Sequence, residues 1–197
     1  MYERKDAFYR RAKREGYRSR AAYKLEELQR EHRLLRKGDR VADLGCWPGG
    51  WMQVAVEAVG PAGRVVGIDL DETEPLPNEN ALALRGDLAE VGVYARILDA
   101  LGGPADVVLC DAAPKLTGVR ATDRAREEAL LEALEALAPK LLRVGGTFVA
   151  KLLEAPEAQA FVARLRPRFG AVRITKSKAT RKGSSEKYLI ARDFLGA

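Results

Sequence analysis

The chain has 197 residues, 47% of them hydrophobic, and a formal net charge of +6, so it is long enough for one substantial core. No Pro/Gly/Ser-rich linker divides it, and residues 1–197 are expected to form a single domain. The charged start lacks the apolar stretch of a signal peptide, and no apolar run is long enough to span a membrane, which predicts a cytoplasmic protein with no membrane partner.

Histidine and cysteine are too scarce for several kinds of chemistry. His32 is the only histidine, and Cys46 and Cys110 are the only cysteines. This excludes a disulfide framework, serine or cysteine catalysis that depends on histidine, and a zinc site with several His or Cys ligands. We therefore expect no metal.

Basic side chains crowd residues 1–20, with aromatic side chains between them. A solvated charged face is the alternative, but the basic excess of the whole chain favours a polyanion that is gripped electrostatically and whose bases can stack. A second basic cluster precedes the end of the chain. The residues expected to contact RNA are Arg10, Arg11, Lys13, Arg14, Arg18, Arg20, Arg181 and Lys182, with Lys115 either gripping a phosphate or remaining solvated.

The first periodic segment after this basic arm is "SRAAYKLEELQREHRLL", which predicts a helix with Ser19 as its cap. Apolar runs then alternate with helical patterns, which predicts an α/β fold: a mostly parallel sheet with helices on both faces. Strands are expected within 40–45, 64–70, 81–88, 105–111, 145–153, 171–177 and 187–194, and helices within 51–59, 91–101, 123–143 and 156–169. Because only a short basic loop joins the last two strands, the last one is expected to run antiparallel.

The glycine-rich stretch "DLGCWPGGW" lies between the first of these strands and the next helix, where open α/β sheets bind ligands. A dinucleotide site requires G-x-G-x-x-G, whose second glycine lets the pyrophosphate approach the backbone. Trp47 occupies that position, which argues against an NAD-linked oxidoreductase.

Carboxylates end three of the predicted strands: Asp43, Asp69 and Asp87. With no cation in the loop, Asp43 suits a sulfonium or ammonium group, Asp69 a ribose and Asp87 an adenine amino group. Each alone fits an ordinary strand-ending turn. Together they favour S-adenosylmethionine over NAD.

Five motifs, "SRAAYKL", "DLGCWPGGW", "CDAAPKLTG", "FVAKLLE" and "SSEKYLIA", resemble those of the FtsJ/RrmJ family of ribosomal RNA 2′-O-ribose methyltransferases, over about residues 16–192. The resemblance implies a Rossmann-like class I S-adenosylmethionine-dependent methyltransferase fold with seven strands. It also implies a uridine of large-subunit ribosomal RNA, in the assembled subunit, as the substrate. The cofactor-binding residues would be Asp43, Gly45, Cys46, Trp47, Pro48, Gly49, Gly50, Trp51, Asp69, Leu70, Asp87, Leu88 and Asp111.

The catalytic residues that the resemblance implies are Lys24, Asp111, Lys151 and Glu186, here called the tetrad. Asp111 and Lys151 follow parallel strands and Glu186 opens the antiparallel one, so these three should meet at one edge of the sheet. Sequence alone does not place Lys24 there. Our hypothesis is that Lys151 takes or steers the proton of the ribose hydroxyl, that Asp111 orients its ammonium group, and that Glu186 and Lys24 complete the hydrogen-bond network.

Some alternatives stay open. The family has two small residues where this chain has Cys46 and Trp47, and Trp47 could line or narrow the cofactor pocket. The substrate could instead be transfer RNA or an mRNA cap, although the 7% aromatic content offers no obvious cap-stacking platform. A non-catalytic ribosome-assembly factor would be expected to have lost tetrad residues. Cys110, next to Asp111, is expected to be structural, and the protein is expected to be a monomer.

Overall fold

The computed structural model describes residues 7–114, 117–180 and 185–196, and one seven-stranded sheet runs through them. The strand order is β3-β2-β1-β4-β5-β7-β6, with β1 to β5 parallel and β7 antiparallel to both of its neighbours. The sequence predicted the seven strands, the mostly parallel sheet and the reversed last strand, but not the strand order. The strands are β1 (Arg40–Leu44), β2 (Arg64–Asp69), β3 (Ala81–Arg85), β4 (Ala105–Cys110), β5 (Leu142–Leu152), β6 (Phe169–Thr175) and β7 (Lys187–Phe194).

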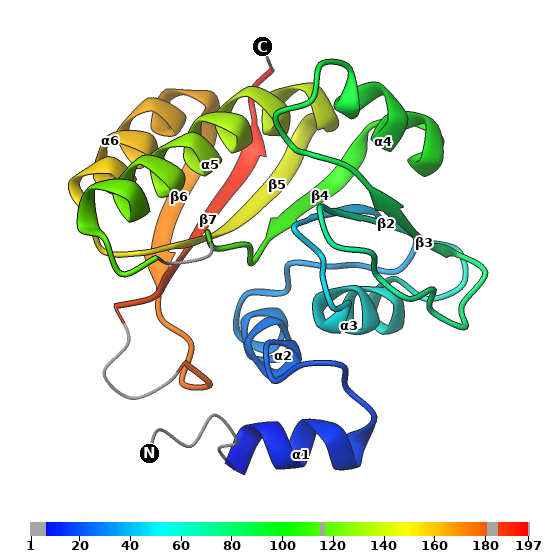
Figure 1. Cartoon of the computed structure of the whole chain (residues 1–197). Coiled ribbons are helices and arrows are strands. Elements are labelled where there is room, and N and C mark those ends of the chain that lie inside the picture. The colour runs from blue at the N-terminus through cyan, green and yellow to red at the C-terminus, as the bar shows by residue number, and fades with distance from the viewer. Residues whose placement is uncertain (1–6, 115–116, 181–184, 197) are drawn as a thin grey trace.

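Helices cover both faces of the sheet (Figure 1). One face carries α4, α5 and α6, and the other carries α2 and α3, with α1 lying beyond α2. The helices are α1 (Ala7–Glu15), α2 (Ala22–His32), α3 (Gly50–Val59), α4 (Val93–Leu101), α5 (Arg120–Leu141) and α6 (Pro156–Leu165), which a short 3₁₀ turn follows (Arg166–Arg168).

Alternation along the strands decides which side chains meet which helices. On β1, Ala42 and Leu44 pack on the α4–α6 side, whereas Val41 packs on the α2–α3 side. Successive strand residues point to opposite faces, so Asp43 shares the α2–α3 face with Val41. The same alternation on β5 puts Lys151 on that face with Val149. The polar strand residues therefore point toward α2 rather than toward α5.

The prediction that Ser19 caps the first long helix was wrong. The helix α2 begins at Ala22, its N-cap residue is Ala21, and no side chain caps it. Ser19 instead packs on the glycine-rich loop, because a Cβ atom placed on Gly50 would lie 2.2 Å from Ser19 Oγ. Close packing of the segment before α2 against this loop took precedence over the local capping preference.

The basic arm contains a helix that the apolar periodicity did not reveal. In α1, Ala12 is buried against Tyr23, and Arg11 Nε pairs with Glu15 Oε1 at 2.8 Å, one helical turn away. Tyr23 donates its hydroxyl hydrogen to Glu15 Oε2 at 2.7 Å, and Phe8 contacts the Tyr23 ring. These contacts dock α1 on α2.

Within the described ranges, no helix is long and apolar enough to cross a membrane. The same residues contain no group of three or more His, Cys, Asp or Glu side chains arranged to hold a metal ion.

Candidate active site

The tetrad side chains meet at the carboxyl edge of the sheet. Lys24 Nζ lies 2.5 Å from Glu186 Oε1 and 3.8 Å from Asp111 Oδ1. Lys151 Nζ lies 3.5 Å from the same Asp111 oxygen and donates a short hydrogen bond to the Asp111 carbonyl oxygen. Two ammonium groups and two carboxylates, drawn from α2, the ends of β4 and β5 and the start of β7, thus form one largely buried cluster.

The sequence did not point to Tyr188, which joins this cluster from β7. Its hydroxyl oxygen lies 2.6 Å from Glu186 Oε1 and 2.9 Å from Asp111 Oδ1, so its single hydrogen can be donated to either carboxylate. Tyr188 pairs with Lys151 in the sheet register, which explains why both reach the same edge. A signal existed: Tyr188 is the only hydroxyl in the otherwise apolar run "YLIA", two residues after Glu186.

The charges of the cluster stabilise one another. Burial alone would raise the pKa of Glu186, but the Lys24 ammonium and the Tyr188 hydroxyl outweigh it, and the pKa of Glu186 is lowered. Burial, followed by the two neighbouring carboxylates, raises the pKa of the Tyr188 hydroxyl far above its usual range. Tyr188 therefore keeps its proton and acts as a hydrogen-bond donor between the Glu186 and Asp111 side chains.

Asp43 is the most unusual group near the site. It is the last residue but one of β1 and has 1% of its surface exposed, and neither of its carboxylate oxygens has a hydrogen-bond partner among the residues that the structure describes. Burial, followed by the Asp111 and Asp69 carboxylates, raises the pKa of Asp43 well above its usual range. An orphaned buried carboxylate beside other acids is a plain indication of a missing cationic partner. The site thus fits the sulfonium and ammonium charges of S-adenosylmethionine.

The glycines of the loop between β1 and α3 allow close packing. A Cβ atom on Gly45 would lie 2.4 Å from the Ala112 Cβ atom, so the loop abuts the segment that follows Asp111. Gly49 has φ +105° and a Cβ atom there would lie 2.9 Å from Arg18. A side chain at Gly45 or Gly49 would push the loop out of its place between the strand ends and the segment before α2.

The other predicted cofactor residues occupy the same edge. Asp69 accepts hydrogen bonds from the Trp47 and Asp71 backbone N–H groups, both at 2.9 Å, and Asp87 accepts one from Ala89 N–H at 2.9 Å. The Trp47 and Leu70 side chains are exposed, at 56% and 61%. Because more than half of Trp47 is exposed, its side chain is not buried inside the loop.

Trp51, Cys46 and Cys110 are buried. The Trp51 indole N–H donates to the Ala21 carbonyl oxygen at 2.9 Å and its ring contacts Tyr188, so Trp51 supports the start of α2. Burial raises the pKa of the Cys110 thiol to about 12, which disfavours the thiolate that a cysteine-dependent base methylation requires.

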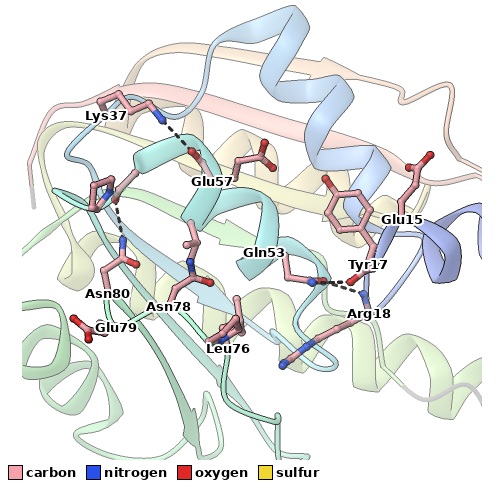
Figure 2. Close-up of a pocket in the computed structure, with 15 residues that line it drawn as sticks. Glu15, Tyr17, Arg18, Lys37, Gln53, Glu57, Leu76, Asn78, Glu79 and Asn80 are labelled. Carbon is pink, nitrogen blue, oxygen red and sulfur yellow. Dashed lines mark hydrogen bonds between the residues drawn. The ribbon is translucent and has the colours of Figure 1, made fainter.

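A cavity of about 770 Å³ lies elsewhere, between the outer side of α3, the segment before α2 and residues 76–80 (Figure 2). Neither the tetrad nor the strand-end carboxylates line it, so it is not the site of methyl transfer. Its polar groups bind one another: Gln53 accepts from Arg18 N–H at 2.9 Å and donates to the Gly16 carbonyl oxygen at 3.0 Å. Figure 2 shows these bonds, which hold the segment leading into α2 against α3.

The predicted RNA-contacting residues fall into three groups. Arg10, Lys13 and Arg14 are exposed on α1, while Arg11 pairs with Glu15. Arg18 donates to the Glu74 and Pro75 carbonyl oxygens at 2.5 and 2.8 Å, and Arg20 to the Ala179 carbonyl oxygen at 2.7 Å, so both tie segments of the fold together. The third group, Lys115, Arg181 and Lys182, lies outside the described residues.

The strand order, with an antiparallel strand between β5 and β6, is that of the Rossmann-like fold of S-adenosylmethionine-dependent methyltransferases. The chain belongs to one family within that class, the FtsJ-like methyltransferases, whose model matches residues 17–194. It is therefore a methyltransferase of Rossmann-like fold, as the motifs indicated.

Curated relatives and solved structures agree with this assignment. Two proteins named ribosomal RNA large subunit methyltransferase E are similar over nearly the whole chain. The one from Methanothermobacter thermautotrophicus is 44% identical over 98% of this chain and 91% of its own. The one from Rhizorhabdus wittichii is 47% identical over 97% of this chain and 82% of its own.

Among solved structures, a Plasmodium falciparum protein described as a ribosomal RNA methyltransferase superposes with a TM-score of 0.79 at 29% identity, over 92% of this chain and all of that one. Aeropyrum pernix fibrillarin, solved with bound S-adenosylmethionine, superposes with a TM-score of 0.62 at 17% identity, over 89% of this chain and 75% of that one, and shows the shared fold.

Proposed function

We propose that this protein transfers a methyl group from S-adenosylmethionine to a ribose 2′-hydroxyl of large-subunit ribosomal RNA, with a uridine in the assembled subunit as the target. The observation that carries the proposal is the meeting of Lys24, Asp111, Lys151 and Glu186 at the carboxyl edge of the sheet. Support for the RNA comes from relatives 44% and 47% identical that are named for the large ribosomal subunit.

S-adenosylmethionine, when bound, supplies an electrophilic methyl group on a positively charged sulfur. The residues that would hold it are Asp43, Asp69 and Asp87 with their neighbours Leu70 and Leu88, the loop from Gly45 through Cys46, Trp47, Pro48, Gly49 and Gly50 to Trp51, and Asp111. Asp43 is suited to the cationic end, because it is the buried acid with free oxygens. The exposed Trp47 and Leu70 side chains would cover the flat face of the adenine ring on the solvent side.

The tetrad acts on the other reactant. A ribose hydroxyl is a weak nucleophile until its proton begins to leave, so a base beside it and correct alignment both raise the rate. Lys151 either takes that proton as a neutral amine, and becomes an ammonium group, or steers it by hydrogen bonding. Asp111 holds the Lys151 amino nitrogen in place from 3.5 Å, while Lys24 and Glu186, 2.5 Å apart, complete the hydrogen-bond network around the hydroxyl.

The basic helix α1 is proposed as the grip on the RNA backbone. Its exposed side chains Arg10, Lys13 and Arg14 are free to reach phosphates, and α1 lies beyond α2, which carries Lys24 (Figure 1). Arg11, Arg18 and Arg20, which hold other parts of the fold, and Lys115, Arg181 and Lys182 are proposed to add to this grip. We further propose that the chain works as one methyltransferase domain, as a monomer in the cytoplasm.

The test is methylation of large ribosomal subunits that lack 2′-O-methyl groups, with S-adenosylmethionine labelled in its methyl group. The label is expected in a nucleotide whose 3′ linkage resists alkali, because a methylated 2′-oxygen cannot attack it. Lys151→Ala should abolish incorporation and leave S-adenosylmethionine binding unchanged. Label that is released by alkali, or a Lys151→Ala variant with normal turnover, would refute the proposal.

A further inference from the structure

A second buried acid lies on α2, outside the tetrad. Glu27 is 6% exposed and follows Lys24 by three positions, which places the two side chains on the same side of the helix. Its Oε2 atom accepts a hydrogen bond of 2.5 Å from Ser177 Oγ and one of 3.2 Å from Ala179 N–H. Glu27 therefore ties α2 to the segment that follows β6.

That segment leads back to the tetrad. Thr180 N–H donates to the Ser177 carbonyl oxygen at 3.1 Å, and Thr180 Oγ1 donates to Glu186 Oε1 at 3.4 Å. Glu186 in turn pairs with Lys24 at 2.5 Å. The contacts form a closed ring: from Glu27 through residues 177–180 to Glu186, then through Lys24 and back along α2 to Glu27.

Burial makes this ring stiff. A carboxylate removed from water is unfavourable unless hydrogen bonds replace its hydration, and Ser177 and Ala179 supply them. Ser177 and Ala179 are themselves buried. A shift of residues 177–180 away from α2 would break both hydrogen bonds that replace the hydration of the Glu27 carboxylate, so the ring opposes a change in the distance between α2 and the start of β7.

We infer that Glu27 is a positioning residue for methyl transfer, which holds Lys24 in register with Glu186 by anchoring residues 177–180. The inference rests on the proposed function, because the aligned pair is the one assigned to the ribose. Glu27 touches no reactant. It acts through the placement of two groups that do.

Three variants on one helix test this. Glu27→Ala removes the acceptor, Glu27→Gln keeps one acceptor oxygen for Ser177, and Glu31→Gln is the matched control, because Glu31 is exposed on the same helix. Glu27→Ala is expected to lower kcat roughly tenfold to a hundredfold, as misplacement of catalytic groups does. Its S-adenosylmethionine Kd and its KM for the ribosomal substrate should stay within about twofold of wild type. Glu27→Gln should restore part of kcat, and Glu31→Gln should equal wild type.

Ser177→Ala provides a second route that leaves α2 unchanged. Because Ser177 and Glu27 share one hydrogen bond, the kcat loss of the Ser177→Ala, Glu27→Ala double variant should be smaller than the product of the two single losses. Hydrogen exchange of the backbone amides of residues 177–180 and 185–190 should be faster in Glu27→Ala, whatever the activity. Exchange thus reports the anchor independently of methyl transfer.

The outcomes separate the two proposals. If wild type transfers no methyl group to RNA, the proposed function fails, whereas unchanged amide exchange in Glu27→Ala refutes the anchor. If wild type is active and Glu27→Ala matches Glu31→Gln in kcat, the positioning role is wrong and the function stands. A parallel loss of kcat, S-adenosylmethionine binding and melting temperature would mark Glu27 as a general structural residue and would also refute the inference.

Discussion

Tyr188 shows how one neutral side chain can organise several charges. Its hydroxyl lies within 2.9 Å of carboxylate oxygens of both Asp111 and Glu186, and its high pKa keeps it a donor. Without that hydrogen, the two carboxylates would lose a shared hydrogen-bond donor, and the repulsion between them would be stronger. Tyr188 therefore belongs with the tetrad as a group that sets its geometry.

Tyr188→Phe should lower kcat by about tenfold, because one hydrogen bond to a charged group contributes about 1.5–3 kcal/mol and part of that serves alignment. The ring and its contact with Trp51 remain, so folding should be preserved. Steady-state kinetics and calorimetry with S-adenosylmethionine measure the effect. A variant with wild-type kcat would show that the hydroxyl has no part in alignment.

Asp43 is the residue at which stability and binding oppose each other. Because its pKa is raised in the folded protein, the folded state holds this proton more tightly than the unfolded chain, and stability falls as pH rises from the usual carboxyl range through the raised pKa. Asp43→Asn removes this dependence. At neutral pH it should stabilise the ligand-free protein by about 1 kcal/mol, or roughly 2–4 °C in Tm.

The same variant should bind S-adenosylmethionine at least about tenfold more weakly, because a cation loses its buried counter-charge. Thermal melts of Asp43→Asn and wild type between pH 5 and pH 9 measure the stability difference, and calorimetry measures the affinity for S-adenosylmethionine. The Tm difference between the two should grow with pH. A difference that shrinks with pH would contradict the assignment of a raised pKa.

At the scale of elements, α1 is the part whose role depends most on charge. Its exposed cations lie on a helix that is docked on α2 through Tyr23, Ala12 and Phe8. Helix formation in the basic arm turns a loose set of charges into one presented face. Such a face can grip RNA with less loss of conformational freedom than a disordered arm.

Replacing Arg10, Lys13 and Arg14 together by Gln should weaken RNA binding and reduce the slope of log K against log salt by about 2, since each phosphate contact contributes about 0.7 on a single strand. The matched control replaces Arg33, Arg36 and Lys37, which lie beyond α2. Filter binding at several KCl concentrations measures both slopes. Equal slopes for the two triple variants would exclude α1 as the grip.

The elements themselves were largely predictable, because strand and helix patterns depend on local spacing. Apolar runs predicted all seven strands of the sheet, and the short loop before Lys187 predicted the antiparallel one. Tertiary packing was not predictable in this way. The position of Lys24, the Tyr188 hydroxyl and the Glu27 anchor all depend on how α2 settles on the sheet, which no local pattern encodes.

At the scale of the whole molecule, the acidic groups at the strand ends are assigned to S-adenosylmethionine and the basic groups on α1 to RNA. Acids gather at the strand ends, where Asp43, Asp69 and Asp87 lie, while the net charge of the chain is +6 and exposed cations gather on α1. The two binding events should therefore respond differently to ionic strength. The buried carboxylate of Asp43 is screened less by salt than exposed cations are.

Raising KCl from 50 to 200 mM should weaken RNA binding by about tenfold or more and change S-adenosylmethionine binding by less than about twofold. Titrations of each ligand at the two salt concentrations decide this. RNA binding that is insensitive to salt would place the recognition surface away from the basic helix. Strong salt dependence of S-adenosylmethionine binding would mean that an exposed acid, and not the buried Asp43, is the counter-charge of the cofactor.

The sheet order also has a consequence for synthesis of the chain on the ribosome. β7 lies between β5 and β6 in the sheet, and Glu186 and Tyr188, at its start, reach the cluster that contains Lys24. Lys24 lies on α2, which is synthesised early. A nascent polypeptide that has emerged only as far as β6 has its cofactor loop but lacks two of the five residues of the cluster, Glu186 and Tyr188. The protein therefore becomes able to catalyse methyl transfer only in a late step of folding, when β7 pairs with β5 and β6.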